Sequence, residues 1–250
     1  MKNPEIQNAV MVSRVDAAVS VLAGVVDSYS PAVFASSFGA EDMVLLDMIS
    51  ENARGIEVFS LDTGRLPKET YRLMTRVRQR YPVSIKVYCP DGRELENYIN
   101  LNGPDAFYNS TAQRKQCCHV RKVEPLRRAL DGKKAWVTGL RSQQSPTREG
   151  LAVSSWDEGN LLQKFNPLLD WSWDEVCTYL GDHDVPYNEL HDKGYPSIGC
   201  APCTRAVEPG EDPRSGRWWW EDANAKECGL HVDDEHDGKY GKDGKDENGK

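Results

Sequence analysis

Four of the seven cysteines in this chain stand in two close pairs, and this spacing is the strongest chemical signal in the sequence. Cys117 and Cys118 are consecutive in "KQCCHVRK", whereas Cys200 and Cys203 form the C-x-x-C of "GCAPCTR". A disulfide between consecutive residues is strained, because their Cα atoms are about 3.8 Å apart and an unstrained bridge needs roughly 4.4–6.8 Å. The consecutive pair is therefore either part of a packed core or two ligands of one metal centre.

The interpretation as a metal centre is stronger when both cysteine pairs are considered together. A lone C-x-x-C is compatible with a redox dithiol, a zinc site or an iron–sulfur cluster. A second pair allows four thiolate ligands in one site. If residues 115–130 form a helix, consecutive side chains diverge by about 100°. Ligands that diverge in this way suit a cluster with several metal vertices better than a single ion, so the pattern favours iron–sulfur over zinc.

The remaining three cysteines differ in their surroundings. We expect Cys89, at the end of a predicted strand, and Cys177, on the apolar face of a predicted helix, to be buried and inert. Cys228 stands in "KECGLH", a segment too polar for a core. Lys226 and His231 lie close to it in sequence, and neighbouring cations favour the thiolate form of a cysteine.

Composition and charge exclude several classes of protein. The chain has 250 residues, of which 39% are hydrophobic, so it can form one large domain or a domain with an elaborated end. We find no segment approaching the roughly 20 apolar residues of a membrane span, and Arg14 and Asp16 interrupt any signal peptide. An odd number of cysteines argues against a disulfide framework. We expect a soluble, cytoplasmic protein that does not contact a membrane.

The distribution of charge points to a small anionic ligand. The net charge of −8 argues against a nucleic-acid partner. Residues 114–128 nevertheless contain six Lys or Arg and a single acid, Glu124. A basic cluster in an acidic protein favours a small anion over a polyanion.

Strands that alternate with helices must position these residues. The predicted strands are 32–38, 56–62, 83–89 and 134–140. Helices are predicted over the first thirty residues, over 40–51, from Pro67 onward, and from the capping box "SWDE" (172–175) to about residue 180. This alternation predicts βαβ units and an α/β fold with a parallel sheet.

The regular pattern ends at Gly194, which divides the chain into three parts. Residues 1–194 form the predicted α/β nucleotide-binding domain, and residues 195–231 carry the C-x-x-C and an irregular carboxyl-terminal lid. Residues 232–250 form a charged tail with no aliphatic side chain after Val232, so we expect the tail to be disordered.

Three predicted strands end in sequences that suit an anion. In an open parallel sheet, ligands bind outside the carboxyl ends of the strands. The first strand runs into "SSFGAED", where small residues lead into a helix and can offer backbone N–H groups. Glu41 and Asp42 are expected in its first helical turn, where they favour the helix dipole. The three strand ends predict a nucleotide or sulfate/phosphate site. Its candidates are Ser36, Ser37, Phe38 and Gly39; Asp62, Thr63 and Gly64; and Gly139, Arg141 and Arg148.

Seven segments of the chain, in order, resemble the assimilatory adenosine 5′-phosphosulfate (APS) reductases of bacteria, which are relatives of the 3′-phosphoadenosine 5′-phosphosulfate (PAPS) reductases. The segments are "SSFGAED", "LDTGR", "CCHVRKVEPL", "GLRSQQSPTR", "GYPSIGCAPCTR", "RSGRWWWE" and "KECGLH". The resemblance spans roughly residues 31–231, and its combination of "CC", "CxxC" and "ECGLH" is highly specific. It implies an adenine-nucleotide α-hydrolase-like fold of the PP-loop type, and a homo-oligomer.

The resemblance also implies a cofactor and a reaction. Cys117, Cys118, Cys200 and Cys203 would hold a [4Fe–4S] cluster. Cys228 would attack the sulfur of the sulfate group of APS and expel AMP. Reduced thioredoxin, or a glutaredoxin-like reductant, would then release sulfite.

The resemblance further implies a set of cations that shield the incoming thiolate from the substrate oxygens. These candidates are Lys122, Arg214, Arg217 and His231. We expect the triple Trp218–Trp220 to anchor the lid without a chemical role.

Three other functions remain open at this point. A PAPS reductase would use the same chemistry, and no residue reveals a pocket for a 3′-phosphate. An iron–sulfur or zinc nucleotide-binding regulator would use Cys228 as a sensing thiol. An ATP-pyrophosphatase-type ligase shares the fold but usually carries a fuller S-G-G-x-D-S loop than "SSFGAED".

Overall fold

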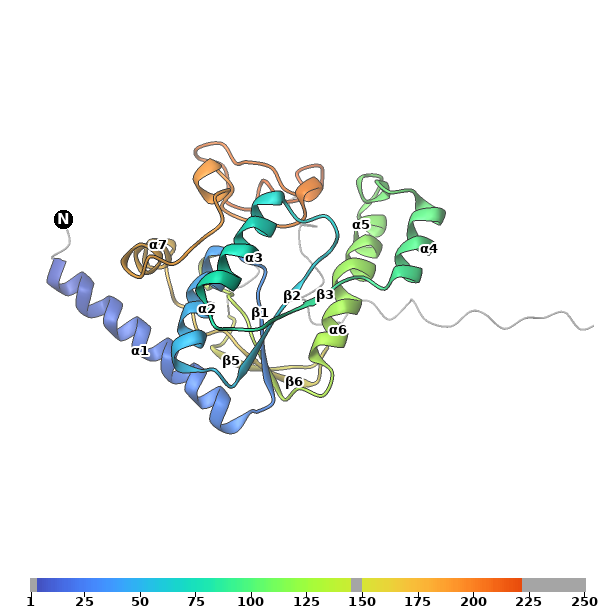
Figure 1. Cartoon of the computed structure of the whole chain (residues 1–250). Coiled ribbons are helices and arrows are strands. Elements are labelled where there is room, and N and C mark those ends of the chain that lie inside the picture. The colour runs from blue at the N-terminus through green and yellow to red at the C-terminus, as the bar shows by residue number, and fades with distance from the viewer. Residues whose placement is uncertain (1–3, 145–149, 222–250) are drawn as a thin grey trace, which may run out of the picture.

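A six-stranded sheet with helices on both faces forms the centre of the protein (Figure 1). The computed structural model describes residues 4–144 and 150–221. The strand order is β3-β2-β1-β4-β6-β5, and every pair is parallel except the β5–β6 pair. The strands are β1 (Ala32–Ala35), β2 (Ile56–Leu61), β3 (Ile85–Tyr88), β4 (Ala135–Val137), β5 (Ser154–Asp157) and β6 (Leu162–Phe165). The predicted α/β fold with a parallel sheet is confirmed.

The antiparallel hairpin of β5 and β6 was not predicted from the sequence. Its strands are short, and β5, at the edge of the sheet, exposes Ser154 and Trp156. Such an edge strand needs few apolar side chains, so its sequence lacks the hydrophobic pattern that revealed the central strands.

The helices agree with the sequence pattern. They are α1 (Pro4–Ser28), α2 (Ala40–Asn52), α3 (Lys68–Arg80), α4 (Gly92–Asn102), α5 (Thr111–Cys118), α6 (Glu124–Leu130) and α7 (Trp173–Asp182). The capping box is present at α7: the Ser172 hydroxyl accepts a hydrogen bond from the Glu175 N–H, and the Glu175 carboxylate accepts one from the Ser172 N–H. The helical conformation continues from α5 through residues 119–123 into α6.

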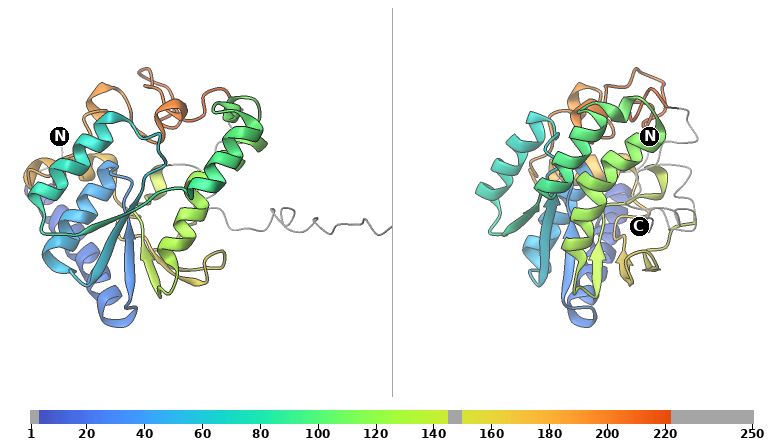
Figure 2. Two further views of the ribbon diagram at one scale, coloured as in Figure 1. Left: turned by 45° about the vertical axis from the view of Figure 1, so that its right-hand side comes forward. Right: turned by 90° about the vertical axis from the view of Figure 1, so that its right-hand side faces the viewer.

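Alternating side chains of the strands face two apolar layers. Phe34 and Val137 pack in a core with α1, α2, α3 and α7. Val33 and Trp136 face the opposite side, where they pack with Leu126 and other residues of α6. Figure 2 shows these layers from two directions. With the faces covered, the carboxyl ends of β1, β2 and β4 are the part of the sheet that can reach a ligand.

Helix α1 corrects one expectation. Its segment Asn8–Ser28 is long and apolar enough to cross a membrane by length and composition, although the sequence suggested that no such segment exists. This is weak evidence for a membrane span, because helices of soluble cores pass the same criterion. Ala18, Leu22 and Val25 are completely buried, and Arg14 forms an ion pair with Glu175 of α7. One side of α1 therefore packs on the domain, although only 17% of its apolar window is buried.

The two cysteines expected in the core are exposed, so that prediction was wrong. The buried face of α7 consists of Val176, Tyr179 and Leu180, and Cys177 points away from it. Cys89 follows β3, at the edge of the sheet opposite β5.

Candidate functional site

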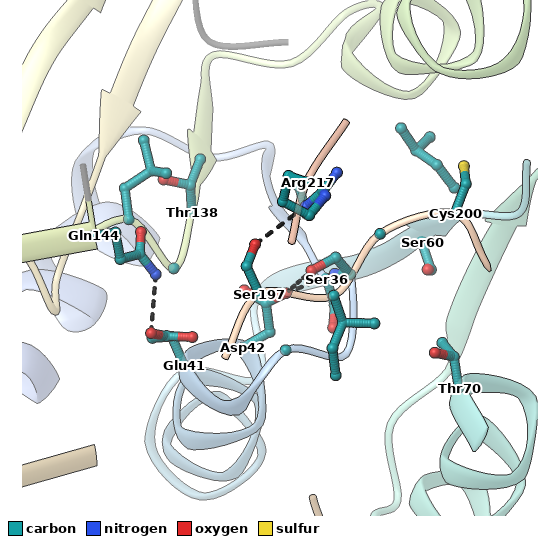
Figure 3. Close-up of a pocket in the computed structure, with 18 of the residues that line it drawn as sticks. Ser36, Glu41, Asp42, Ser60, Thr70, Thr138, Gln144, Ser197, Cys200 and Arg217 are labelled. Atoms are coloured by element: carbon teal, nitrogen blue, oxygen red, sulfur yellow. Dashed lines mark hydrogen bonds between the residues drawn. The ribbon is translucent and has the colours of Figure 1, made fainter. Parts of the chain in front are cut away.

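A cavity of about 470 Å³ lies at the carboxyl ends of β1, β2 and β4, a size typical of small-ligand sites. Residues 196–200 and 213–218 close it from the opposite side (Figure 3). Ten of the predicted site residues line this one cavity: Ser36, Ser37, Gly39, Thr63, Lys122, Gly139, Arg141, Cys200, Arg214 and Arg217.

Three predicted substrate-binding residues do not line the cavity: Phe38, Asp62 and Gly64. The Phe38 side chain is buried in the core, and its φ of 61° places the backbone in the left-handed region at the turn into α2. The Asp62 carboxylate accepts hydrogen bonds from the Gly64 N–H and the Tyr71 hydroxyl, and so shapes the turn after β2. Three further predicted residues, Arg148, Cys228 and His231, lie outside the described residues.

Asp42 occupies the loop that was predicted to offer N–H groups to an anion. Its Oδ2 accepts hydrogen bonds from the Ser37 N–H at 2.6 Å and from the Ser37 hydroxyl at 2.7 Å. Burial raises the pKa of Asp42 to about 6, although these hydrogen bonds oppose the rise. A Cβ at Gly139 would lie 2.4 Å from Asp42 Oδ1, so this carboxylate requires glycine at position 139.

Glu41 neutralises one of the predicted anion-binding arginines. Arg141 Nε lies 2.8 Å from Glu41 Oε1, and Gln144 Nε2 donates to the same oxygen at 2.9 Å. Both members of the ion pair are largely buried. Glu41 and Asp42 do lie in the first turn of α2, as predicted, but their side chains form the polar floor of the cavity.

The positive charge of the cavity comes from Lys122, Arg214 and Arg217, which also line it. Arg217 Nη1 lies 3.2 Å from the Ser197 hydroxyl, and the guanidinium packs on the backbone of Gly199 (Figure 3). A Cβ at Gly199 would lie 2.3 Å from Arg217 Nη2, so a side chain at position 199 would displace the guanidinium. The cavity therefore combines a floor in which Glu41 is paired with Arg141 and three further cationic side chains, an arrangement that suits a ligand with one anionic end.

The four paired cysteines meet beside this cavity. Cys117, Cys118, Cys200 and Cys203 line one small cavity, and Cys200 also lines the large one. The Cys200 sulfur lies 3.3 Å from the Thr63 hydroxyl. Burial raises the pKa of Cys117 and raises that of Cys203 to about 12. Within residues 4–144 and 150–221, no group of three or more His, Cys, Asp or Glu is arranged to hold a single metal ion.

A wide helical turn follows the consecutive cysteines. Residues His119–Val123 adopt a π-helix between α5 and α6. Pro125, at the start of α6, lacks an N–H and cannot donate to the residue-121 carbonyl, a local cause for the wide turn. Arg121 is buried after this turn, and its Nη1 donates to the Thr63 carbonyl at 2.6 Å.

Several residues that build the cavity were missed by the sequence interpretation. Ser197 and Gly199 lie in "GYPSIGCAPCTR" and Gln144 in "TGLRSQQSPTR", so the motifs marked the right segments. His191 also lines the cavity, and no motif identified it. Burial lowers the pKa of His191, which favours a neutral imidazole at neutral pH.

An open, mostly parallel α/β sheet with a polar cavity at its carboxyl edge defines the class of nucleotide-binding α/β proteins. The phosphoadenosine phosphosulfate reductase domain matches residues 31–206, and the chain belongs to this family. The adenosine 5′-phosphosulfate reductase of Allochromatium vinosum is 50% identical over 230 residues, which cover 92% of this chain and 90% of that protein.

Two solved structures show the same fold. The PAPS reductase from Candida auris, in a phosphate complex, has a TM-score of 0.67 and 29% identity, with 83% of this chain and 98% of that chain covered. The FMN adenylyltransferase of Candida glabrata, in complex with FMN and an ATP analogue, has a TM-score of 0.54 and 18% identity. The match covers 85% of this chain and 73% of that chain, and it shows the fold alone.

Proposed function

We propose that this protein is an APS reductase of sulfate assimilation, which converts APS to sulfite and AMP. The observation that carries the proposal is 50% identity, over nine tenths of both chains, to a protein named adenosine 5′-phosphosulfate reductase. The cavity supports it independently, because it lies where nucleotides bind in such sheets and is lined by Lys122, Arg214 and Arg217.

The reaction takes place in two displacements. The Cys228 thiolate attacks the sulfur of the APS sulfate group, so an S–S bond forms, the bond from sulfur to the bridging oxygen breaks, and AMP leaves. A thiolate of reduced thioredoxin then attacks Cys228 Sγ and releases sulfite. The second thioredoxin thiol resolves the mixed disulfide and regenerates Cys228, so the thioredoxin dithiol supplies both electrons.

The cations of the cavity make the first displacement feasible. A thiolate that approaches a sulfate group is repelled by the charged oxygens. Lys122, Arg214 and Arg217 line the same cavity, where they can neutralise these oxygens and the phosphate that leaves with AMP. His231 is proposed to contribute near Cys228. The pair of Glu41 and Arg141 keeps the floor of the cavity polar without adding a net charge.

The donor set of the cysteine site supports an iron–sulfur cluster. Four thiols converge from two segments, and two buried donors around them, Arg121 Nε and Trp218 Nε1, have no hydrogen-bond acceptor in the described part of the chain. The sulfur atoms of a cluster at this site would accept hydrogen bonds from these two donors. Cys117, Cys118, Cys200 and Cys203 would hold a [4Fe–4S] cluster, which when bound would supply structural order and an electrostatic field beside the substrate.

PAPS is the second candidate substrate, because the Candida auris structure is of a PAPS reductase. Its identity of 29% is well below the 50% shared with the APS reductase, so APS is preferred. We further propose that the enzyme acts in the cytoplasm as a homo-oligomer with thioredoxin as its reductant.

The test is sulfite release from APS and from PAPS by the purified protein with reduced thioredoxin. We expect sulfite from APS and a lower kcat/KM for PAPS. A kcat/KM that is higher for PAPS would overturn the substrate assignment. Nucleotide binding without sulfite release from either compound would overturn the assignment as a reductase.

A further inference from the structure

A buried ion pair connects α5 to the segment that bears the cavity arginines. Arg114 lies three and four residues before the consecutive cysteines, and its side chain is 1% exposed. Its Nε and Nη2 donate to the two carboxylate oxygens of Glu221 at 2.9 and 2.8 Å. The Glu221 side chain is 4% exposed. A buried bidentate pair of this kind contributes little net stability compared with apolar residues, but it fixes geometry.

Trp218 connects Arg114 to the cavity, because its ring contacts both Arg114 and the cavity residue Arg217. The centroid of its indole ring lies 4.6 Å from the Arg114 Cζ and 4.7 Å from the Arg217 Cζ. Trp218 is 1% exposed, and its backbone N–H donates to the Cys203 carbonyl at 3.2 Å. The Glu221 N–H donates to the Trp218 carbonyl at 2.9 Å, so the acid and the indole belong to one turn.

The position of Arg217 depends on this turn. Its backbone forms an antiparallel bridge with Thr204, and its guanidinium is confined by Gly199, Ser197 and the Trp218 ring. Of these contacts, the Trp218 ring offers the largest side-chain surface to the guanidinium, because Gly199 has no side chain. A shift of the indole would therefore redirect Arg217 in the cavity.

We propose that Arg114 is a positioning residue for the reaction: through Glu221 and Trp218 it holds the Arg217 guanidinium in the orientation that binds the anionic end of the substrate. This rests on the proposed function, since the anion concerned is the phosphosulfate of APS. Arg114 does not line the substrate cavity, so its effect on substrate must pass through Arg217.

A double-mutant cycle in APS affinity tests this inference. All variants carry Cys228→Ser, so that APS binds without reacting, and Kd is measured by calorimetry. Arg114→Met is combined with Glu221→Gln, because removing both charges avoids a buried unpaired carboxylate. We expect this pair to raise Kd about fivefold to tenfold with Arg217 present, and less than twofold with Arg217→Ala. Arg114→Lys keeps the positive charge but loses the bidentate, stacked geometry of the guanidinium. In a second cycle with Arg217→Ala, it should therefore also raise Kd more when Arg217 is present than when it is absent.

The matched control is Arg128→Met with Glu124→Gln, which removes an exposed ion pair on α6 and should leave Kd unchanged. An equal rise of Kd in both Arg217 backgrounds would contradict the inference, because it would show a general structural effect. No rise of Kd in either background would contradict the inference too.

If the Cys228-containing parent binds APS but releases no sulfite, the proposed function fails while the cycle still tests Arg114. If the protein does not bind APS, both are wrong.

Discussion

The floor of the substrate cavity and the neighbouring cysteine site are built in different ways. The floor consists of turns that directly follow β1 and β4, so the sheet itself brings Ser37, Glu41 and Arg141 together. The cysteine site joins two segments more than eighty residues apart, and neither pair stands at the end of a strand. The sheet therefore fixes the floor, whereas the cysteine site depends on contacts between side chains and on the group that the thiols bind.

This difference has a physical consequence for stability. The floor contains its own charge compensation, since Arg141 faces Glu41 and Ser37 donates to Asp42. The cysteine site gathers thiols and buried cations, and two of its buried donors, Arg121 Nε and Trp218 Nε1, have no acceptor among residues 4–144 and 150–221. We expect the floor to be stable without a cofactor and the cysteine site to require one.

The largest effect should follow from breaking the cysteine site. Serine in place of Cys117, Cys118, Cys200 or Cys203 should remove iron and sulfide and lower turnover about a hundredfold or more, because the ligands of a cluster act as a unit. Iron analysis, visible absorbance and sulfite release measure this. Cys177→Ser is the control, since Cys177 is exposed on α7, and it should retain iron and activity. Full activity in a colourless, zinc-loaded protein would contradict the cluster.

Breaking the floor should have a smaller effect that does not depend on iron. Arg141→Met leaves Glu41 buried without its partner and should lower the free energy of unfolding by about 3–5 kcal/mol. Arg128→Met, which removes one member of an exposed pair, should cost at most about 1 kcal/mol. Urea unfolding of both variants, with and without iron, separates the two regions. A cost at Arg141 that disappears when iron is absent would show that the floor also depends on the cluster.

The smallest effect concerns the pH dependence of the floor. Between pH 4 and about 6 the folded chain keeps a proton on Asp42 that the unfolded chain has released, because its pKa is raised from 3.8 to about 6. Stability should therefore decrease as the pH rises through this window, by on the order of 2 kcal/mol. Asp42→Asn should remove this component of the pH profile. An unchanged profile in that variant would assign the titration to another group.

The same contrast explains what the sequence could predict. Ser36, Ser37, Thr63 and Arg141 were identifiable because the ends of parallel strands meet at one edge, a rule that needs no side-chain contacts. The cysteine pairs were identifiable from spacing. The ion pair of Arg114 with Glu221 spans 107 positions and has no local pattern, so nothing in the sequence connected them.

Charge compensation was also beyond the sequence interpretation. Arg141 was expected to serve the ligand, but its partner Glu41 lies 100 positions earlier and only the folded sheet brings them together. The error at Cys177 has a different, local origin: the apolar face of α7 is formed by Val176, Tyr179 and Leu180, and Cys177 was wrongly assigned to it.

The central claim is that Cys228 is the nucleophile of an APS reductase, and intact-mass analysis tests it most directly. The protein is mixed with APS in the absence of thioredoxin. We expect one sulfonate group per chain on Cys228, release of an equal amount of AMP, and discharge of the adduct as sulfite when reduced thioredoxin is added. Cys228→Ser should form no adduct and keep its iron. An adduct on another cysteine, or sulfite release by Cys228→Ser at the parent rate, would contradict the account.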